Sequence, residues 1–274
     1  MADRVQDLIE KLRVKPGAKV KLKDHDPRDK SRFKDEEETK AETAALAREI
    51  DILQDRLYAE GSRALLVILQ GTDTSGKDGT IRGVFNATGP LGVSVHAFGP
   101  PSTLELEHDY LWRVHAACPR RGTIGIFNRS HYEDVLIGRV KKLAPDKIIE
   151  QRYDQINDFE KMLVETGTTV LKFMLHISKD EQKERLQERL DDPEKHWKFN
   201  PGDLEDRKHW DDYQEAYEVM LARCSTSLAP WYVIPADRKW VRNAAIATIV
   251  RATLDEMDPQ YPKVSWKPKD FEIE

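Results

Sequence analysis

Two glycines and a lysine at fixed spacing mark the first segment of the chain that could do chemistry. Residues 71–80 read GTDTSGKDGT and directly follow an apolar run at residues 64–69. Such a turn lets consecutive N–H groups converge on an anion at the start of the next helix, and Lys77 adds a mobile positive charge. The spacing is that of the P-loop, GxxxxGK, except that Asp78 replaces the usual Ser or Thr. The predicted phosphate-binding residues are Gly71, Thr74, Ser75, Gly76, Lys77, Asp78 and Gly79.

A second polar segment follows another apolar stretch. Residues 122–127 read GTIGIF and predict a strand, and residues 128–134 read NRSHYED. A P-loop kinase would carry its second metal-binding carboxylate at the first of these seven positions, which is Asn128 here. Glu133 and Asp134 come one turn later, and Arg129 is placed to meet a phosphate. The turn at residues 99–101 also follows a predicted strand, so we expect it beside the phosphate site, where open parallel sheets bind ligands.

Residues 179–213 form a third segment of interest, because they alternate in charge and break at Pro193 and Pro201. Small-nucleotide kinases place a mobile, arginine-bearing lid after a late strand. The same charge pattern is also typical of a solvated helical hairpin with many ion pairs. From the residues alone, both interpretations remain open.

The elements that must position these residues follow from hydrophobic periodicity. We expect strands over residues 64–69, 92–98, 122–127, 170–177 and 231–234, and helices over residues 35–60, 77–87, 102–117, 147–166, 204–224 and 240–257. Ser102 and Glu105 have the spacing of a capping box at the start of one helix. Strands that alternate with helices predict an α/β fold with a five-stranded parallel sheet and helices on both faces.

The N-terminal region is rich in Lys and Arg over residues 13–34, includes Pro16 and Gly17, and shows no helical period. Either an extended arm lying over the body or a solvated tail would have this composition. We treat residues 1–34 as a basic arm on a single domain that spans residues 1–274.

Composition narrows the class of protein. The 274 residues carry a net charge of −5, and 34% of them are charged. Because no apolar run is long enough for a transmembrane helix and no secretory signal is evident, we expect a cytoplasmic protein without a membrane partner. The acidic balance argues against general binding to nucleic acid. Cys118 and Cys224 form no CxxC pair, so we interpret them as ordinary thiols.

Taken together, the segments at residues 71–79, 128–135 and 195–207 resemble the polyphosphate kinase type 2 family, over about residues 13–262. The family pattern GxDxxGKDG matches residues 71–79, and it explains Asp78 because an Asp follows the lysine across the family. Most members begin the second segment with Asp and carry Asn a few residues later. This chain has Asn128 and Glu133 there, which resembles the subclass (class III) that phosphorylates both nucleoside mono- and diphosphates.

The resemblance implies a P-loop kinase-like fold with a helical lid over residues 179–213, and an activity that moves the terminal phosphoryl group of polyphosphate to AMP or ADP. It implies Mg²⁺, with Mn²⁺ as an alternative ion, held by Asp73 and Glu133. Asp73, Lys77, Arg129 and Glu133 would be catalytic. The implied nucleotide-binding residues are Asn128, Arg129, Glu133, Pro100 and Arg113, and the further polyphosphate-binding residues are Arg82, Arg189, Lys195 and Lys198. The implied partners are polyphosphate, AMP, ADP, ATP and further copies of the chain in a dimer or tetramer.

Two other functions compete with this hypothesis. A nucleotide kinase that takes ATP and phosphorylates a small acceptor would share the fold and the lid, but it would be expected to keep Ser or Thr after Lys77. A non-catalytic scaffold that only binds nucleotide or polyphosphate is disfavoured, because Asp73, Lys77, Arg129 and Glu133 are all present.

Overall fold

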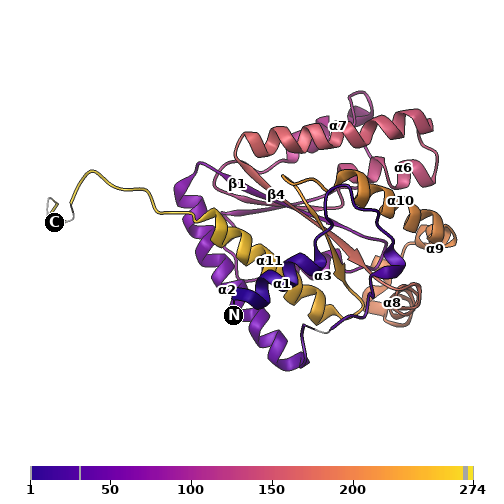
Figure 1. The fold of residues 1–274 in the computed structure, drawn as a ribbon, viewed down its shortest axis with the longest axis horizontal. Helices are drawn as coiled ribbons and strands as arrows, with labels where there is room; N and C mark the ends of the chain where they lie inside the picture. Colours follow the sequence, from indigo (N-terminus) through magenta and orange to yellow (C-terminus); the bar gives the residue numbers. More distant parts are fainter. Residues whose placement is uncertain (1, 31, 268–270, 274) are drawn as a thin grey trace.

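The computed structural model describes residues 2–30, 32–267 and 271–273, and a parallel sheet forms its centre (Figure 1). The five strands are β1 (Ala64–Gln70), β2 (Val93–Ala97), β3 (Ile124–Asn128), β4 (Thr168–His176) and β5 (Trp231–Pro235). They lie in the order β2-β3-β1-β4-β5, and every neighbouring pair is parallel. The predicted α/β fold with a five-stranded parallel sheet is confirmed.

The central strand β1 explains why its sequence is apolar without alternation. All seven of its residues are buried, because helices cover both faces of the sheet. Leu65, Val67 and Leu69 belong to the core on one face, whereas Leu66 and Ile68 belong to the core on the other. The two hydrophobic cores are thus separated by the sheet.

The helices form the two outer layers. One face is covered by α1 (Ala2–Leu12), α2 (Glu36–Glu60), α3 (Lys77–Val84) and α11 (Lys239–Met257), and the other by α5 (Trp112–Ala117), α7 (Asp146–Glu165) and α10 (Trp210–Cys224). Two short helices, α4 (Thr103–Leu106) and α6 (Ile137–Val140), and the 3-10 turn η2 (His131–Asp134) lie in the connections. Helix α2 is capped at both ends, with Asp35 accepting a bond from the Glu38 N–H at its start and Gly61 in the left-handed conformation at its end.

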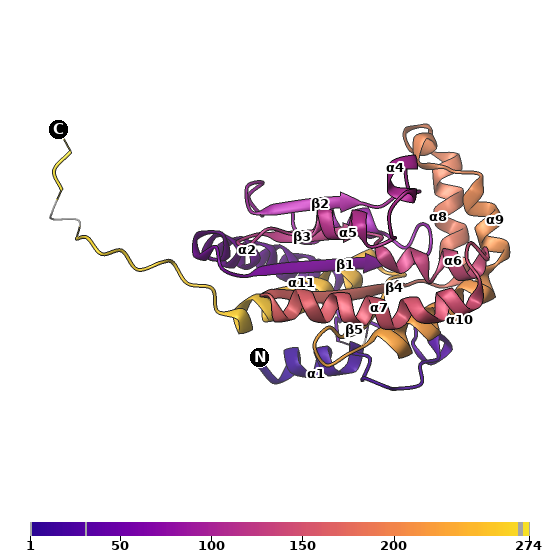
Figure 2. The same ribbon diagram turned by 90° about the horizontal axis from the view of Figure 1, so that it is seen from above.

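The predicted lid region extends past the carboxyl ends of the strands (Figure 2). It consists of α8 (Lys179–Asp191), the 3-10 helix η3 (Pro193–Lys198) and α9 (Gly202–Lys208), and α10 follows directly. The strand ends and these helices therefore surround the same space, which is where the polar segments of the sequence converge.

Three predicted helices have different bounds in the structure. The helix expected over residues 102–117 is wrong, because α4 and α5 are separate. The Asp109 side chain accepts a bond from the Leu111 N–H at 3.0 Å, a local turn that competes with helix formation. The capping box at Ser102 and Glu105 is confirmed. The helix expected over residues 204–224 breaks between α9 and α10 at His209, and the one expected over residues 77–87 ends at Val84.

The N-terminal region contains a helix that the sequence analysis missed, α1, followed by a segment that lies along the body. The Val14 N–H donates to the Trp231 carbonyl at 2.8 Å, and the Asp237 N–H donates to the Pro27 carbonyl at 3.1 Å. Leu22, in the short 3-10 helix η1 (Leu22–Asp24), is only 1% exposed. The basic residues are therefore carried on a strap that runs beside β5. Within residues 2–30, 32–267 and 271–273, no helix has the length and apolar character needed to cross a membrane.

Candidate active site

The phosphate-binding loop connects β1 to α3 and turns at three residues with positive φ. Gly71 has a φ of +154°, Thr74 of +64° and Gly76 of +100°. A side chain at Gly71 would not fit, because its Cβ would lie 2.7 Å from the Ser75 hydroxyl and 2.8 Å from the Leu175 carbonyl oxygen. Glycine here lets the loop close tightly against β4.

Lys77 begins α3, and its side chain folds back over the loop. Its Nζ donates to the carbonyl oxygens of Gly71 at 2.8 Å and Thr72 at 3.2 Å. Burial, together with the positive charge of Arg129, lowers the pKa of Lys77 to about 8. No side chain caps the start of α3 at Gly76. The free N–H groups of the helix start and the ammonium can therefore act on the same anion.

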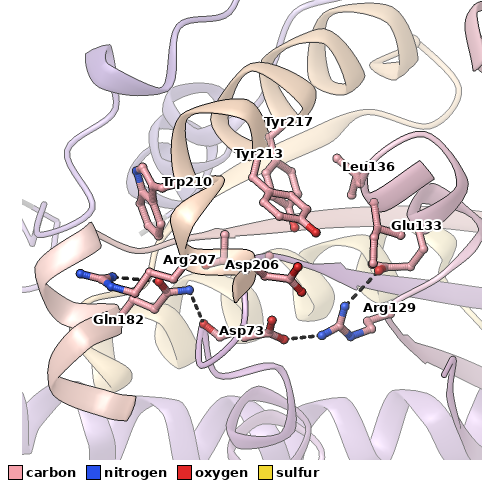
Figure 3. A pocket seen from close by; sticks show the side chains of 13 residues that line it. Asp73, Arg129, Glu133, Leu136, Gln182, Asp206, Arg207, Trp210, Tyr213 and Tyr217 are labelled. Atoms are coloured by element: carbon pink, nitrogen blue, oxygen red, sulfur yellow. Dashed lines mark hydrogen bonds and ion pairs between the residues drawn. The ribbon is translucent and has the colours of Figure 1, made fainter. Parts of the chain in front are cut away.

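Asp73, Arg129 and Glu133 form a row along one side of the pocket (Figure 3). Arg129 has a left-handed φ of +63°, and its N–H donates to the Leu69 carbonyl at 3.0 Å, which fixes it at the end of β3. Its guanidinium forms ion pairs with Asp73 and, at 3.0 Å, with Glu133. Burial alone would lower the pKa of Arg129, but the carboxylates of Glu133 and Asp73 outweigh it and raise the pKa above its usual value. The sequence predicted all three residues, and the structure brings them together.

The two departures from the common P-loop pattern contact each other. Asn128 follows β3 in place of the usual carboxylate, and its Nδ2 donates to the Asp78 Oδ1 at 2.6 Å. A second carboxylate at position 128 would instead face Asp78 with like charge. In this chain the amide ties the start of α3 to the end of β3.

The pocket also contains residues that the sequence analysis did not single out. Its further lining includes Gln182, Asp206, Arg207, Trp210, Tyr213 and Tyr217. Figure 3 shows Tyr213, Tyr217 and Asp206 facing the row of charges from α9 and α10. Gln182 Nε2 donates to the Asp73 carbonyl at 3.3 Å, and Arg207 donates to Gln182 at 2.9 Å. All of them except Tyr217 lie in the charged run at residues 179–213, and this was a signal, but charge alternation alone does not tell which members of the run face inward.

Several predicted residues lie outside this pocket. Arg113 donates to the Gly99 carbonyl at 2.9 Å, beside the exposed Pro100 at the end of β2. Arg82 is exposed on α3. In the lid region, Arg189 donates to the Lys198 carbonyl and to Asp203, and Lys195 pairs with Asp192 at 3.0 Å. None of these residues is among those that line the pocket.

Asp73 and Glu133 are the carboxylates that could share a metal ion. Among the residues that the structure describes, no group of three or more His, Cys, Asp or Glu side chains could hold one. Mg²⁺ in phosphate-transfer sites takes only one or two carboxylates, with water and substrate phosphates completing its shell. The oxygen donors of Asp73 and Glu133, which already meet around one cation, fit this kind of ion.

The sheet is all-parallel, a P-loop follows its central strand β1, and an arginine lies between two carboxylates after the neighbouring strand β3. These features define a P-loop phosphotransferase. The sequence model of the Polyphosphate kinase 2 family matches residues 32–262. The chain belongs to this family, as its motifs predicted, and is therefore an enzyme of phosphoryl transfer.

Similar proteins agree with this assignment. An AMP/ADP-polyphosphate phosphotransferase of Meiothermus ruber is 54% identical over 256 residues, which cover 93% of this chain and 96% of that protein. An ADP-polyphosphate phosphotransferase of Rhodopseudomonas palustris is 42% identical over 225 residues and 78% of each protein. The crystal structure of polyphosphate kinase 2 from Arthrobacter aurescens TC1 superposes with a TM-score of 0.92 at 43% identity, covering 96% of this chain and 94% of that one.

Proposed function

We propose that this enzyme transfers the terminal phosphoryl group of inorganic polyphosphate to AMP and to ADP, reversibly and with Mg²⁺. The observation that carries the proposal is the row of Asp73, Arg129 and Glu133 beside the P-loop. The name and the 54% identity of the Meiothermus ruber relative support the choice of substrates. Asn128 and Glu133 together support the use of a monophosphate acceptor, since this exchange sets the chain apart from most members of the family.

The loop and Lys77 would hold the phosphoryl group that moves. The N–H groups at the start of α3 are already oriented for an anion, so binding a phosphate there requires no reorganisation of the loop. The Nζ of Lys77, now bonded to the Gly71 and Thr72 carbonyls, needs only to rotate away from them to reach a phosphate oxygen. Both groups neutralise negative charge and perform no covalent chemistry.

Arg129 would bind the phosphate of the acceptor nucleotide. Its planar fork matches two phosphate oxygens, and the acceptor would replace the two carboxylates that it now contacts. An oxygen of the acceptor phosphate attacks the terminal phosphorus of polyphosphate and forms a new P–O bond. The P–O bond to the next phosphate breaks, and its electron pair leaves with the shortened chain. Positioning and charge neutralisation provide most of the catalysis in such a transfer.

Asp73 and Glu133 would hold Mg²⁺, or Mn²⁺ in its place. When bound, the ion neutralises phosphate oxygens and orients them for in-line transfer. The exchange of partners follows from charge: when Arg129 turns to the acceptor phosphate, its two carboxylates lose their counter-ion. They can then accept a divalent cation without burying a new negative charge.

The residues around the pocket would complete the binding of both substrates. We place Asn128, Pro100 and Arg113 on the nucleotide side, at the ends of β3 and β2. Residues 179–213 would act as the lid, and opening the internal bonds of Arg189 would free it for polyphosphate. Burial and the nearby charge of Asp73 raise the pKa of Asp203 to about 6. The ionised carboxylate that pairs with Arg189 is therefore disfavoured at this position. Lys195, Lys198 and Arg82 would guide the outer part of the chain.

We also propose that the enzyme is a homo-oligomer, a dimer or tetramer, in the cytoplasm. Apolar side chains exposed near the β2 edge support this, namely Val95, Leu104, Leu106 and Trp112. Light scattering coupled to size-exclusion chromatography measures the mass directly. A monomer at micromolar concentration would contradict the assembly and leave the chemistry unaffected.

Phosphorus NMR of the purified protein with Mg²⁺, polyphosphate and AMP tests the proposed function. We expect the β-phosphate signal of ADP and then the γ-phosphate signal of ATP to appear as the terminal phosphates of polyphosphate are consumed. If neither appears while ATP reacts with another small acceptor, the enzyme is an ATP-dependent kinase instead. If the protein binds polyphosphate and transfers nothing in either assay, it is a scaffold.

A further inference from the structure

Arg242 lies directly beneath the phosphate-binding loop, on the side away from the pocket lining. It belongs to α11, which packs against α3 (Figure 1), and it is only 3% exposed. A Cβ on Gly76 would lie 1.8 Å from its Nη1, and a Cβ on Gly79 would lie 3.0 Å from its Nη2. The glycines of the loop are therefore needed to admit this guanidinium as well as to curl the backbone.

Among the residues that the structure describes, no carboxylate pairs with Arg242. Its Nη1 donates to the Ser75 carbonyl at 3.4 Å, and its Nε and Nη2 donate to the Asn243 Oδ1 at 3.1 and 2.9 Å. Within the described part of the chain it takes part in no ion pair. Burial, together with the charge of Arg185, lowers the pKa of Arg242 to about 9. A buried charge without a counter-ion is costly, so its retention here needs a reason.

A neighbouring arginine shows what a purely structural role looks like. Arg185 on α8 uses its Nε on Glu181 at 2.7 Å. Its Nη1 donates to the Thr74 and Ser75 carbonyls, and its Nη2 donates to the Ala236 and Asp237 carbonyls, all at 2.7 to 3.2 Å. All five of its donors are thus used and its charge is paired. Arg242, so close by, shares only the Ser75 carbonyl with it.

The shared carbonyl orients one peptide group of the loop. Because the C=O and N–H of a trans peptide point in opposite directions, holding the Ser75 carbonyl toward the two arginines turns the Gly76 N–H the other way. Among the described residues, no protein group accepts a bond from that N–H. A phosphate bound by it and the uncompensated guanidinium of Arg242 would lie on opposite sides of a single peptide.

We propose that Arg242 is a positioning residue whose counter-ion is the phosphate in the loop: it holds the Ser75–Gly76 peptide with its N–H toward the anion and adds a buried positive charge behind it. This inference rests on the proposed function, because it assigns the anion to the polyphosphate end of the site. It also explains how a loop without the usual Ser or Thr after Lys77 gains extra attraction for a highly charged donor.

Replacing Arg242 with Met and with Lys tests the inference, and Arg251→Met is the matched control. Arg251 lies on the same helix but pairs with Glu49 at the surface, at 2.8 Å. Binding of inorganic triphosphate is measured by calorimetry, thermal unfolding is measured without ligand, and KM for polyphosphate and kcat are measured separately.

We expect Arg242→Met to weaken triphosphate binding and raise KM for polyphosphate about tenfold, which corresponds to about 1.4 kcal/mol, with kcat within about threefold. Its ligand-free melting temperature should equal or exceed that of the unmodified protein, because an unpaired buried charge is gone. Arg242→Lys should bind within about threefold, and Arg251→Met should bind normally.

Unchanged triphosphate binding in Arg242→Met overturns the inference. So does a loss that Arg242→Lys fails to restore. A ligand-free melting temperature lowered by several degrees in Arg242→Met also overturns it, because the loss of binding would then come from a weakened fold. Failure of the unmodified protein to transfer phosphate from polyphosphate overturns the proposed function instead, and the binding comparison of the three variants still decides the role of Arg242.

Discussion

Two clusters of charged side chains lie on either side of the same short segment, residues 129–133, and they are built differently. Arg129 and Glu133, at its ends, face the pocket and meet Asp73. His131 and Tyr132, between them, face the core and meet Glu160. One segment therefore carries an open cluster on one side and a closed cluster on the other.

The closed cluster is fully buried, and its charged groups are paired with one another. Lys172 on β4 is 0% exposed, and its Nζ donates to Glu160 at 2.5 Å, to the Tyr132 hydroxyl at 2.9 Å and to the Cys224 carbonyl at 2.6 Å. Burial alone would raise the pKa of Glu160, but the charge of Lys172 and the contacts of His131 outweigh it and lower the pKa. Its charges are all used to hold β4, η2, α7 and α10 together.

The open cluster has charges that hold only one another. Arg129 bridges two carboxylates, and Lys77 lies nearby on backbone carbonyls. Each of these contacts can be exchanged for a phosphate or a cation without leaving a charge unpaired. The difference teaches that ion pairing by itself does not separate structural from functional charge. What separates them is whether a ligand can take a partner's place.

The largest effect is expected from breaking the closed cluster with Glu160→Ala. This leaves the Lys172 ammonium buried without a counter-ion, and removing one partner of a buried pair costs about 3 to 5 kcal/mol. Urea unfolding followed by circular dichroism measures the loss.

Two controls show whether the loss comes from the unpaired charge. The double replacement Glu160→Gln with Lys172→Met removes both charges and should recover at least half of the stability. Glu49→Ala breaks the surface pair with Arg251 and should cost less than about 1 kcal/mol. If the double variant is no more stable than Glu160→Ala, the charges of the closed cluster are not what holds it.

Breaking the open cluster should affect activity and not stability. For Lys77→Ala we expect kcat/KM to fall. The fall should correspond to a loss of about 2 to 4 kcal/mol of transition-state stabilisation, which is the effect of one lost electrostatic donor. The free energy of unfolding should not fall, because the buried ammonium contacts only carbonyl oxygens and has its pKa lowered to about 8. Lys40→Ala, at an exposed ion pair on α2, is the matched control. Unchanged turnover in Lys77→Ala would remove this residue from the mechanism.

The sequence predicted the open cluster better than the closed one, for a physical reason. The proposed site residues Asp73 and Arg129 follow strands in short glycine-bearing or polar segments, so their type and spacing carry information. Lys172 stands inside an apolar strand, where only the fold reveals that Glu160 lies opposite. Local turn chemistry limited the prediction in the same way: Asp109 interrupts a helix that the apolar pattern alone would continue.

The two buried arginines show more clearly what cannot be predicted from the sequence alone. Arg185 stands in a charged helix, where a solvated position is the ordinary interpretation, and Arg242 stands before an apolar run. Their burial depends on how α8 and α11 pack against the P-loop, which no local pattern encodes. Conversely, the five strands, the capping box of α4 and the meeting of the three charged site residues all followed from short-range patterns and from the geometry of parallel sheets.

A smaller change would sharpen the description of the open cluster. Glu133→Asn removes one of the two carboxylates on Arg129 and leaves a polar side chain that is one methylene shorter. We expect kcat/KM with AMP to fall about tenfold more than kcat/KM with ADP, a difference of about 1.4 kcal/mol. Coupled assays with each acceptor measure the ratio. An equal loss with both acceptors would contradict the assignment of Glu133 to the monophosphate reaction.

The smallest expected effect is a pH dependence that separates the two clusters. Since the pKa of Lys77 is about 8 in the folded protein, its charge is present below pH 8 and is lost as pH rises through this value. We therefore expect kcat/KM for polyphosphate to fall about fourfold between pH 7 and pH 8.5, as the free enzyme loses the proton. Lys77→Arg keeps its charge and should lack this step.

Stability should change in the opposite direction over the same range. The pKa of Lys77 is lower in the folded chain than the ordinary value of 10.5, so between about pH 8 and pH 10 the unfolded chain binds more protons and the free energy of unfolding rises with pH. The difference between the unmodified protein and Lys77→Met isolates this contribution from those of other groups. A kcat/KM that stays flat to pH 9, or an unfolding difference that does not change with pH, would mean that Lys77 is as well paired as Lys172 and belongs with the closed cluster.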